Sequence, residues 1–344
     1  MSPAGRWRVE RGGFRPRGNR WEPFAAGSTN RLWRGKGPSG DWLLKWYKHP
    51  QPGVHPEPEV SRFLQERGFA GVPEFGARLD RLGAEGCATA AYIQRWIPGR
   101  AAWDVAVEEL HGGTSLRRWA RDLGQRIGAL HAALASGENA ATPSFGTTPY
   151  SVKHHEGWIR RVSAVAEQLR AALRASPPSG ILPAAWEEAR ASWIAGEPRW
   201  RERVHSLESL RVGGSCSRIH GDLHLGQILE TDAPGLSSRW WVVDFEGEPL
   251  RPLAQRRALD LPLRDVAGMW RSFDYAAATA GVASDAAVPL QEAFLEGWNE
   301  WMPLPDGDWK GLFRALVWEK SIYEALYEIT HRPAWLWVPL RSLA

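Results

Sequence analysis

The sequence predicts an α+β chain with two lobes, a small β-rich lobe with one helix and a larger, mostly helical lobe. Its 344 residues exceed the usual size of one compact domain. Short apolar runs separated by Gly- and Pro-rich turns gather before residue 98, and apolar stripes of helical period follow it. We therefore divide the chain into a short N-terminal segment (1–26), a small lobe (27–97) and a large lobe (98–344).

The small lobe is predicted from strands alternating with turns. The stretch WEPFAAGSTNRLWRGKGPSGDWLLKWYK (21–48) reads as three strands joined by two turns, and its WLLKWY run is typical of a buried strand. EVSRFLQERG (59–68) is predicted as a helix, and VPEFGARLDR (72–81) and CATAAYIQRWIPG (87–99) as two more strands. Residues 1–20, rich in Arg and Gly, are expected to be poorly ordered.

The large lobe is predicted from helical stripes that a strand pair interrupts. The pair comprises RIHGDLHLGQILE (218–230) and RWWVVDFEG (239–247). Together the two lobes place an active site in the cleft between them. The expected helices cover 114–136, 151–175, 184–211, 265–281, 288–301 and 311–329.

The composition limits the classes of function that the protein can have. A hydrophobic share of 43% supports a packed core, and a net charge of +4 with a pI of about 9.2 suits anionic ligands such as nucleotides. Because acids are interspersed with the bases, nucleic-acid binding draws only on the pI and is not indicated. Cys87 and Cys216 form no disulfide or zinc pattern, and no apolar run approaches the ~18–20 residues of a membrane span. We therefore expect a cytoplasmic protein without membrane contact.

The stretches HGDLHLGQILE (220–230) and WWVVDFEGEP (240–249) hold the chemistry. Phosphoryl transfer from ATP needs a base that orients the hydroxyl, oxygen ligands for Mg²⁺, and a lysine on the phosphates. Asp222 and Gln227 have the spacing of a catalytic base and a metal-binding amide, and Asp244 follows an apolar strand as a second metal ligand would.

Upstream residues supply the remaining parts in order. Gly27, Ser28 and Thr29 form a turn whose backbone N–H groups can face phosphates, and Lys45 lies within a strand. Glu59 on the following helix can pair with Lys45, with Glu57 as the second choice. Each part alone is a weak signal, but their order predicts a kinase-type phosphotransferase.

Two other interpretations use the same region. His220, Asp222 and His224 could form a zinc site, although Gly221 and Gly226 argue against the regular helix that its spacing needs. A non-catalytic nucleotide-binding regulatory module is disfavoured because every catalytic part is present.

Three segments resemble the maltokinase family, within the aminoglycoside-phosphotransferase-like and protein-kinase-like enzymes. They are HGDLHLGQIL, VVDFEGEPLRPLAQRRALDLPLRDVAGMWRSFDYAA and EKSIYEALYEITHRPAWLWVPLRSL, and weaker similarity extends over about residues 27–344. The resemblance implies a bilobal protein-kinase-like fold and transfer of the ATP γ-phosphate to maltose. The product, maltose 1-phosphate, serves α-glucan and glycogen synthesis. A functional link to trehalose synthase or a maltosyltransferase, and a monomer or homodimer, would follow.

The resemblance also implies residue roles. Asp222 would be the catalytic base, Gln227 and Asp244 the Mg²⁺ ligands, and Lys45 the phosphate-binding lysine. Backbone groups at 94–97 would contact the adenine of ATP. His220 would support the catalytic loop, and Glu246 would support the metal or the sugar. Gln94 and Trp96 would lie beside the adenine.

One departure from the family concerns the acceptor. Maltokinases usually carry an N-terminal cap region, whereas 26 residues precede Gly27, so we expect a shortened or absent cap. Because related sequences phosphorylate glucosamine, a glucosamine, other aminosugar or aminoglycoside kinase is the alternative.

The C-terminal helix is the best candidate for the acceptor sugar. Glu319, Tyr323 and Tyr327 follow one another at i,i+4 on one face, with Lys320 beside them. An ordinary solvated helix edge would give the same pattern. Two weaker candidates are His224 and Asp265, and Asp265 would serve equally as a helix N-terminal cap.

Overall fold

The computed structural model describes residues 6–15, 18–24, 30–38, 40–84, 86–113, 115–137, 144–177, 179, 183–248 and 251–343. Two compact units share the chain in alternating segments. The first, which we call the sheet unit, comprises Met1–Val105 and His220–Ala258; the second, the helical unit, comprises Ala106–Ile219 and Leu259–Ala344. The stretch with the predicted catalytic loop thus belongs to the sheet unit, whereas the sequence places it in the large lobe.

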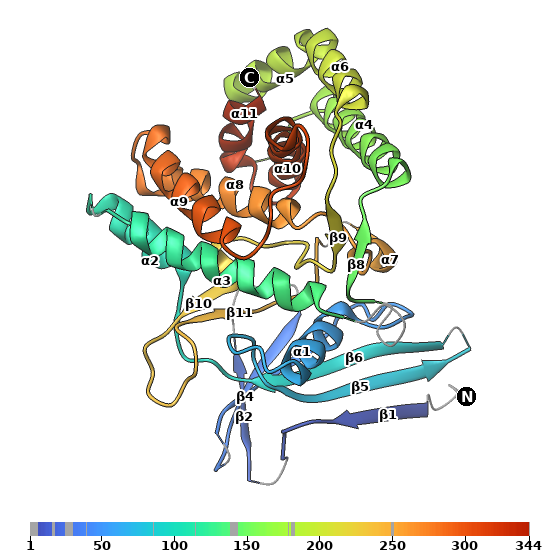
Figure 1. Ribbon diagram of the computed structural model, residues 1–344, viewed down its shortest axis with the longest axis vertical. Helices are drawn as coiled ribbons and strands as arrows, with labels where there is room; N and C mark the ends of the chain where they lie inside the picture. The colour runs from blue at the N-terminus through green and yellow to red at the C-terminus, as the bar shows by residue number, and fades with distance from the viewer. Residues whose placement is uncertain are drawn as a thin grey trace. The chain divides into compact units, whose positions relative to one another are not determined.

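The sheet unit is built on a six-stranded sheet with the order β1-β5-β6-β4-β3-β2, in which all neighbours are antiparallel (Figure 1). Helix α1 (Pro56–Glu66) packs beside β5. The predicted β-rich part with its helix is confirmed. The strands are β1 (Arg6–Arg11), β2 (Arg20–Phe24), β3 (Arg31–Lys36), β4 (Trp42–Trp46), β5 (Phe75–Gly83) and β6 (Gly86–Arg95).

Strand β1 corrects the expectation of a poorly ordered start. It pairs along its length with β5, and its Arg8 guanidinium donates to the Asp80 carboxylate at 2.8 Å. Asp80 is 1% exposed and also accepts the Thr89 hydroxyl at 2.9 Å. A carboxylate this deeply buried needs a cationic partner, so the ion pair contributes to holding β1 on the sheet edge.

Trp42 confirms the prediction that WLLKWY is a buried strand. Its side chain is fully buried between the Phe14 ring, at 5.4 Å between centroids, and the Arg95 guanidinium, 4.1 Å from the ring centroid. Position 76 must be small, because a Cβ on Gly76 would lie 2.7 Å from the Trp42 ring.

A second, three-stranded sheet carries the segments around the predicted catalytic loop. It has the order β11-β10-β7, with β7 (Arg100–Ala101), β10 (Ile228–Glu230) and β11 (Trp240–Val242). The predicted strand pair is therefore shorter than expected. Residues 218–224 form a loop, because Gly221 has a φ of +83°, and a 3₁₀ turn η2 (Leu225–Gln227) precedes β10. The short helix α7 (Leu253–Arg256) follows the sheet.

In the helical unit, the predicted run of helices is confirmed, one of them broken in two, and the structure adds two that were not predicted, Ala102–His111 and Trp337–Leu343. The helix expected over 184–211 is broken at Gly196, which precedes α6, and Pro198 lies in the first turn of α6. A two-stranded sheet of β8 (Thr147–Pro149) and β9 (Ser215–Ser217) accompanies the helices. The helices are α2 (Ala102–His111), α3 (Arg117–Ala135), α4 (Val152–Arg174), α5 (Pro183–Ala195), α6 (Glu197–Ser206), α8 (Leu263–Ala280), α9 (Val288–Asn299), α10 (Trp309–His331) and α11 (Trp337–Leu343), with 3₁₀ turns η1 (Leu207–Ser209), η3 (Ser284–Ala287) and η4 (Pro333–Trp335).

Within the helical unit, α3 and α9 lie side by side at very close range (Figure 1). A Cβ on Gly124 would lie 2.1 Å from the Phe294 carbonyl oxygen, and one on Gly297 would lie 2.1 Å from the Arg121 carbonyl oxygen. Only glycine permits this approach. Helix α10 packs against α4, α8 and α11. Among the described residues, no helix combines the length and apolar character needed to cross a bilayer.

Candidate active site

The loop before β10 is shaped by His220. Its Nε2 lies 2.9 Å from the Val243 carbonyl oxygen, which can only accept, so Nε2 donates there. Nδ1 then accepts the backbone N–H of Asp222 at 3.3 Å, and the ring packs on Phe245 at 4.7 Å between centroids. His220 thus links the Asp222 loop to the segment that carries Asp244.

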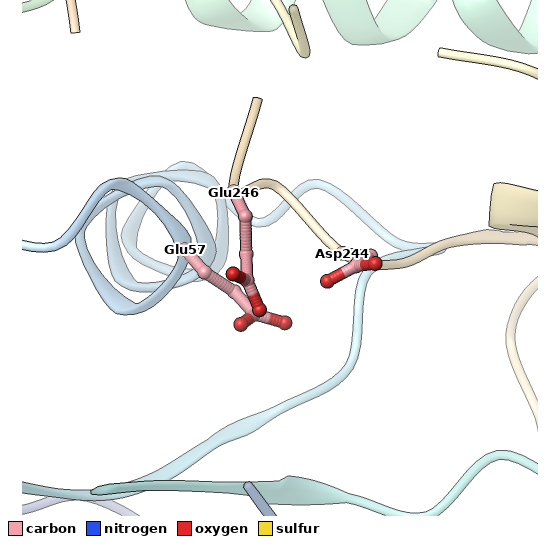
Figure 2. A group of neighbouring side chains, drawn as sticks. All are labelled: Glu57, Asp244 and Glu246. Atoms are coloured by element: carbon pink, nitrogen blue, oxygen red, sulfur yellow. The ribbon is translucent and has the colours of Figure 1, made fainter. Parts of the chain in front are cut away.

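Lys45 on β4 lies at the centre of a group of carboxylates. Its side chain is buried, and Nζ donates to Glu57 Oε1 at 2.8 Å and to Glu246 Oε1 at 3.3 Å. It also contacts Asp244 Oδ1 directly. Figure 2 shows the three carboxylates pointing toward one another, Glu57 from α1 and the other two from the segment after β11.

Glu57, not Glu59, is the helix partner of Lys45, which corrects the first choice made from the sequence. Helix α1 begins at Pro56 with His55 as its N-cap, three residues before the predicted start. Glu57 is therefore in the first turn on the buried side, where its other oxygen accepts the Tyr47 hydroxyl at 2.8 Å. Glu59, two residues further round the helix, instead pairs with Arg257 at 2.6 Å.

The charged groups of this cluster shift one another's pKa values. Burial alone would lower the pKa of the Lys45 ammonium, but Asp244, Glu57 and Glu246 hold it well above its usual value. Burial would raise the pKa of Asp244, and Lys45 instead lowers it to about 2. Burial, with the negative charges of Asp244 and Glu57, raises the pKa of Glu246 to about 8 despite Lys45. The cluster therefore combines a permanent cation with carboxylates of unequal acidity.

Asp244 has an unusual backbone. Its φ is +68°, the single positive value among the described residues other than glycine. Such a conformation costs free energy and persists where the surroundings impose it, often at functional sites. The Gln227 amide Nε2 donates to Asp244 Oδ2 at 3.1 Å. The two residues predicted as metal ligands are thus in direct contact.

The donor atoms suit a hard divalent cation. Glu57, Asp244 and Glu246 each offer a carboxylate oxygen, and these atoms lie within 4.8 Å of one another. Oxygen donors of this kind are what Mg²⁺ prefers. A divalent ion there would compete with the Lys45 ammonium for the same oxygens. Within the part of the chain that the structure describes, His220, Asp222 and His224 do not form a comparable group, so the geometry gives the zinc interpretation no support.

Two contacts of Glu246 were missed by the sequence analysis. The Asn30 amide donates to Glu246 Oε1 at 2.9 Å, and His55 Nε2 lies 3.9 Å from Glu246 Oε2. Asn30 directly follows the Gly-Ser-Thr motif of the sequence, which is a signal that could have pointed to it. The turn itself, Gly27, Ser28 and Thr29, lies outside the described residues.

The positions expected near adenine lie at the end of β6. Gln94 is buried and pairs with Leu43 of β4. The backbone N–H of Trp96 donates to the Asp41 carbonyl at 3.0 Å, and its ring meets the Arg34 guanidinium at 4.5 Å. Since the Trp96 N–H already has an acceptor, adenine contact by this group would require that bond to be exchanged. The adenine role stays a prediction.

The acceptor candidates on α10 are divided between buried and half-buried positions of the helical unit. Glu319 is buried and accepts the Trp158 indole N–H and an Arg264 N–H, both at 2.7 Å. By contrast, Lys320 Nζ lies 4.9 Å from the Tyr323 ring centroid. Glu319 therefore does not share an open face with the other candidates. The last of them, Tyr327, packs on His331 at 4.5 Å between ring centroids.

The two weaker candidates have structural partners. Asp265 is buried in the first turn of α8, where its carboxylate lies 3.0 Å from His131 Nε2, and the N-cap position belongs to Pro262. The alternative of an Asp265 cap is therefore wrong. His224 Nδ1 accepts the Gly226 N–H at 3.1 Å and caps η2.

A buried strand lysine held by a helix glutamate, with an HGD loop and an aspartate after a strand, defines a kinase-type phosphotransferase. The chain belongs to the phosphotransferase enzyme family (APH), whose sequence profile matches residues 20–301. The enzyme transfers a phosphoryl group to an alcohol acceptor, as the sequence predicts.

Two curated relatives are glucosamine kinases. The chain is 28% identical to the enzyme of Streptacidiphilus jiangxiensis, covering 88% of this chain and 68% of the relative. It is 25% identical to the enzyme of Mycolicibacterium smegmatis (strain ATCC 700084 / mc(2)155), covering 88% of this chain and 74% of that protein.

Solved structures show the same fold. A glucosamine kinase in complex with glucosamine, ADP and inorganic phosphate matches with a TM-score of 0.73 at 22% identity, over 99% of this chain and 79% of that one. An amicoumacin kinase in complex with AMP-PNP and Ca²⁺ matches with a TM-score of 0.56 at 14% identity, over 97% and 90%. The predicted α+β, bilobal protein-kinase-like fold is confirmed.

Proposed function

We propose that the protein is an ATP-dependent aminosugar kinase that transfers the γ-phosphate of ATP to a hydroxyl of glucosamine. The observation that carries this proposal is the similarity to two glucosamine kinases over 88% of the chain. Maltose, implied by the maltokinase-like segments, becomes the second candidate acceptor. A role in glycogen and trehalose metabolism depends on that second candidate.

The loop aspartate fits the role of base. Asp222 is half-buried, and its backbone is fixed by the His220 ring. A carboxylate in this position accepts or orients the proton of the sugar hydroxyl as the hydroxyl attacks phosphorus. His220 is a positioning residue, because it acts through the Asp222 and Val243 backbone.

Lys45 and the carboxylates fit the phosphate end of ATP. The Lys45 ammonium neutralises phosphate oxygens in our proposal, while Glu57 keeps it pointed into the site. Gln227 and Asp244 would hold Mg²⁺, which neutralises charge on the phosphates, and Glu246 is a further oxygen donor. Because Lys45 contacts Asp244, nucleotide binding would exchange part of that contact for phosphate.

The acceptor is tested with a panel of glucosamine, maltose and an aminoglycoside in the presence of ATP and Mg²⁺. ADP release is coupled to detection of a phosphorylated sugar by mass, and Asp222→Asn serves as the control for contaminating kinases. We expect turnover on glucosamine well above that on maltose. Turnover on maltose alone would replace the proposal with the maltokinase interpretation.

A further inference from the structure

A cavity of about 240 Å³ lies inside the helical unit, among α5, α6, α10 and α11. Trp193, Trp200 and Trp318 line it, together with Arg199 and Arg203. None of these side chains has a place in the phosphoryl-transfer site, whose Lys45 and carboxylates belong to the sheet unit. The cavity therefore needs an explanation of its own.

The aromatic walls are ordered. The rings of Trp193 and Trp200 stack at 5.6 Å between centroids and 4° between planes, and Trp318 lies 6.3 Å from Trp193. Trp193 and Trp200 are buried, yet within the described part of the chain neither indole N–H meets an acceptor. Because a buried donor without an acceptor costs free energy, two of them in one cavity wall point to a ligand that supplies oxygen.

The same cavity is cationic. The Arg203 guanidinium lies 5.0 Å from the Trp318 ring centroid, and no carboxylate pairs with Arg199 or Arg203 among the described residues. Arg201, between them in sequence, is by contrast paired with Glu197 at 2.8 Å. Arg199 and Arg203 are exposed, so an anion from solvent can reach both, and guanidinium matches phosphate in shape and charge.

We propose that this cavity is a binding site for a phosphorylated monosaccharide, separate from the phosphoryl-transfer site. The arginines suit the phosphate of such a ligand, and the two indole N–H groups suit the oxygens of its sugar ring. The volume lies below the ~300–1,000 Å³ of common ligand pockets, which favours a monosaccharide over a nucleotide. The choice of a sugar phosphate, the product class, rests on the proposed function, whereas the anion site does not.

Glucose 6-phosphate and glucosamine 6-phosphate are the probes, titrated calorimetrically into the full-length protein without ATP. Inorganic phosphate and glucosamine are tested beside them. We expect the sugar phosphates to bind more tightly than either part alone. Arg203→Gln should weaken binding by about tenfold or more, since a charge-assisted hydrogen bond contributes ~1.5–3 kcal/mol. Arg190→Gln is the matched control: Arg190 is exposed, pairs with Glu187 and does not line the cavity, so binding should be unchanged.

Several outcomes would overturn the site. The first is that neither sugar phosphate binds the wild-type protein. The second is that Arg190→Gln and Arg203→Gln weaken binding equally. The third is that glucosamine competes with glucosamine 6-phosphate. Equal affinity for inorganic phosphate would remove the sugar part of the proposal. Trp200→Phe removes an indole N–H while keeping an aromatic ring and should also weaken binding. If sugar phosphates bind as expected but glucosamine is not phosphorylated, the proposed function fails and the site stands.

Discussion

Asp222 carries the first prediction at the scale of single residues. Asp222→Asn keeps the size of the side chain and the backbone N–H that binds His220, but removes the base. We expect turnover to fall by about 10²–10⁴, the usual contribution of a positioned base, while nucleotide affinity is nearly unchanged. Steady-state kinetics and calorimetry with a non-hydrolysable ATP analogue measure the two quantities.

The matched control for this prediction is Asp232→Asn, which makes the same chemical change on an exposed loop. It should leave turnover unchanged. Full activity in Asp222→Asn would show that another group serves as the base.

The second prediction compares Glu57, the buried partner of Lys45, with Glu59, a neighbour on the same helix that does not pair with Lys45 in the structure. Glu57→Gln removes a carboxylate 2.8 Å from the Lys45 ammonium, so kcat/KM for ATP should fall by about tenfold or more, equivalent to ~1.4 kcal/mol or more. Glu59→Gln disrupts the half-buried pair with Arg257 and should change kcat/KM much less. The opposite ranking would restore Glu59 as the functional partner.

At this scale, residues within one short segment were more predictable than contacts between distant ones. The spacing of Asp222, Gln227 and Asp244 is local, so the sequence placed them together. The choice between Glu57 and Glu59 depended on where a helix begins, and a shift of three residues reversed it. Asn30 reaches Glu246 across 216 residues of sequence, so the Gly-Ser-Thr stretch before Asn30 marks the residue but not its partner.

Helix α1 carries the prediction at the scale of elements. Its N-cap, His55, accepts the Glu57 N–H through Nδ1 at 3.4 Å and stacks on Tyr47 at 4.0 Å between centroids. Burial, reinforced by the positive charge of Lys45, lowers the pKa of His55 to about 3. Imidazole in an unfolded chain has a pKa of about 6.5, so between these values the unfolded chain binds the additional proton. Stability is therefore lost as pH falls from about 6.5 toward 3.

His55→Asn tests this linkage, because asparagine also caps helices well. Between pH 7.5 and pH 5 the wild-type protein should lose about 2 kcal/mol more free energy of unfolding than the variant, by the linkage relation. Denaturant unfolding at both pH values measures the difference, and other titrating groups cancel in the comparison. His49→Asn controls for removal of an exposed imidazole. An identical loss in wild type and His55→Asn would contradict the linkage.

Elements were predicted where periodicity was strong and missed where partners lay far away. The stripes of α3, α4 and α10 were long enough to identify each helix. Strand β1 was not predicted, because the ion pair that helps to attach it to the sheet joins Arg8 to the buried Asp80, 72 residues away in sequence. Its alternation RWRVER was nevertheless a usable signal. The loop at 218–224 was read as a strand because its apolar residues outweighed Gly221 in the pattern.

At the scale of the whole molecule, the chain leaves the sheet unit after Val105 and returns to it at His220. The phosphoryl-transfer residues come from both segments of the sheet unit. Lys45 and Glu57 lie in the first segment, and Gln227 and Asp244 lie in the second. A ligand that contacts both groups therefore stabilises the tertiary contact between distant segments of one unit. Stability should accordingly depend on nucleotide concentration.

Scanning calorimetry with Mg²⁺ and a non-hydrolysable ATP analogue tests this coupling. At a free ligand concentration of 100 times Kd, the free energy of unfolding should rise by about 2.7 kcal/mol. If the two units unfold separately, nucleotide should raise the unfolding temperature of the sheet unit alone. Glucose 6-phosphate should raise the unfolding temperature of the helical unit alone. Asp244→Asn should reduce the nucleotide shift, because it removes an oxygen donor that Mg²⁺ and Lys45 share. A nucleotide-dependent shift confined to the helical unit would mean that Lys45 and its carboxylates do not bind the phosphates.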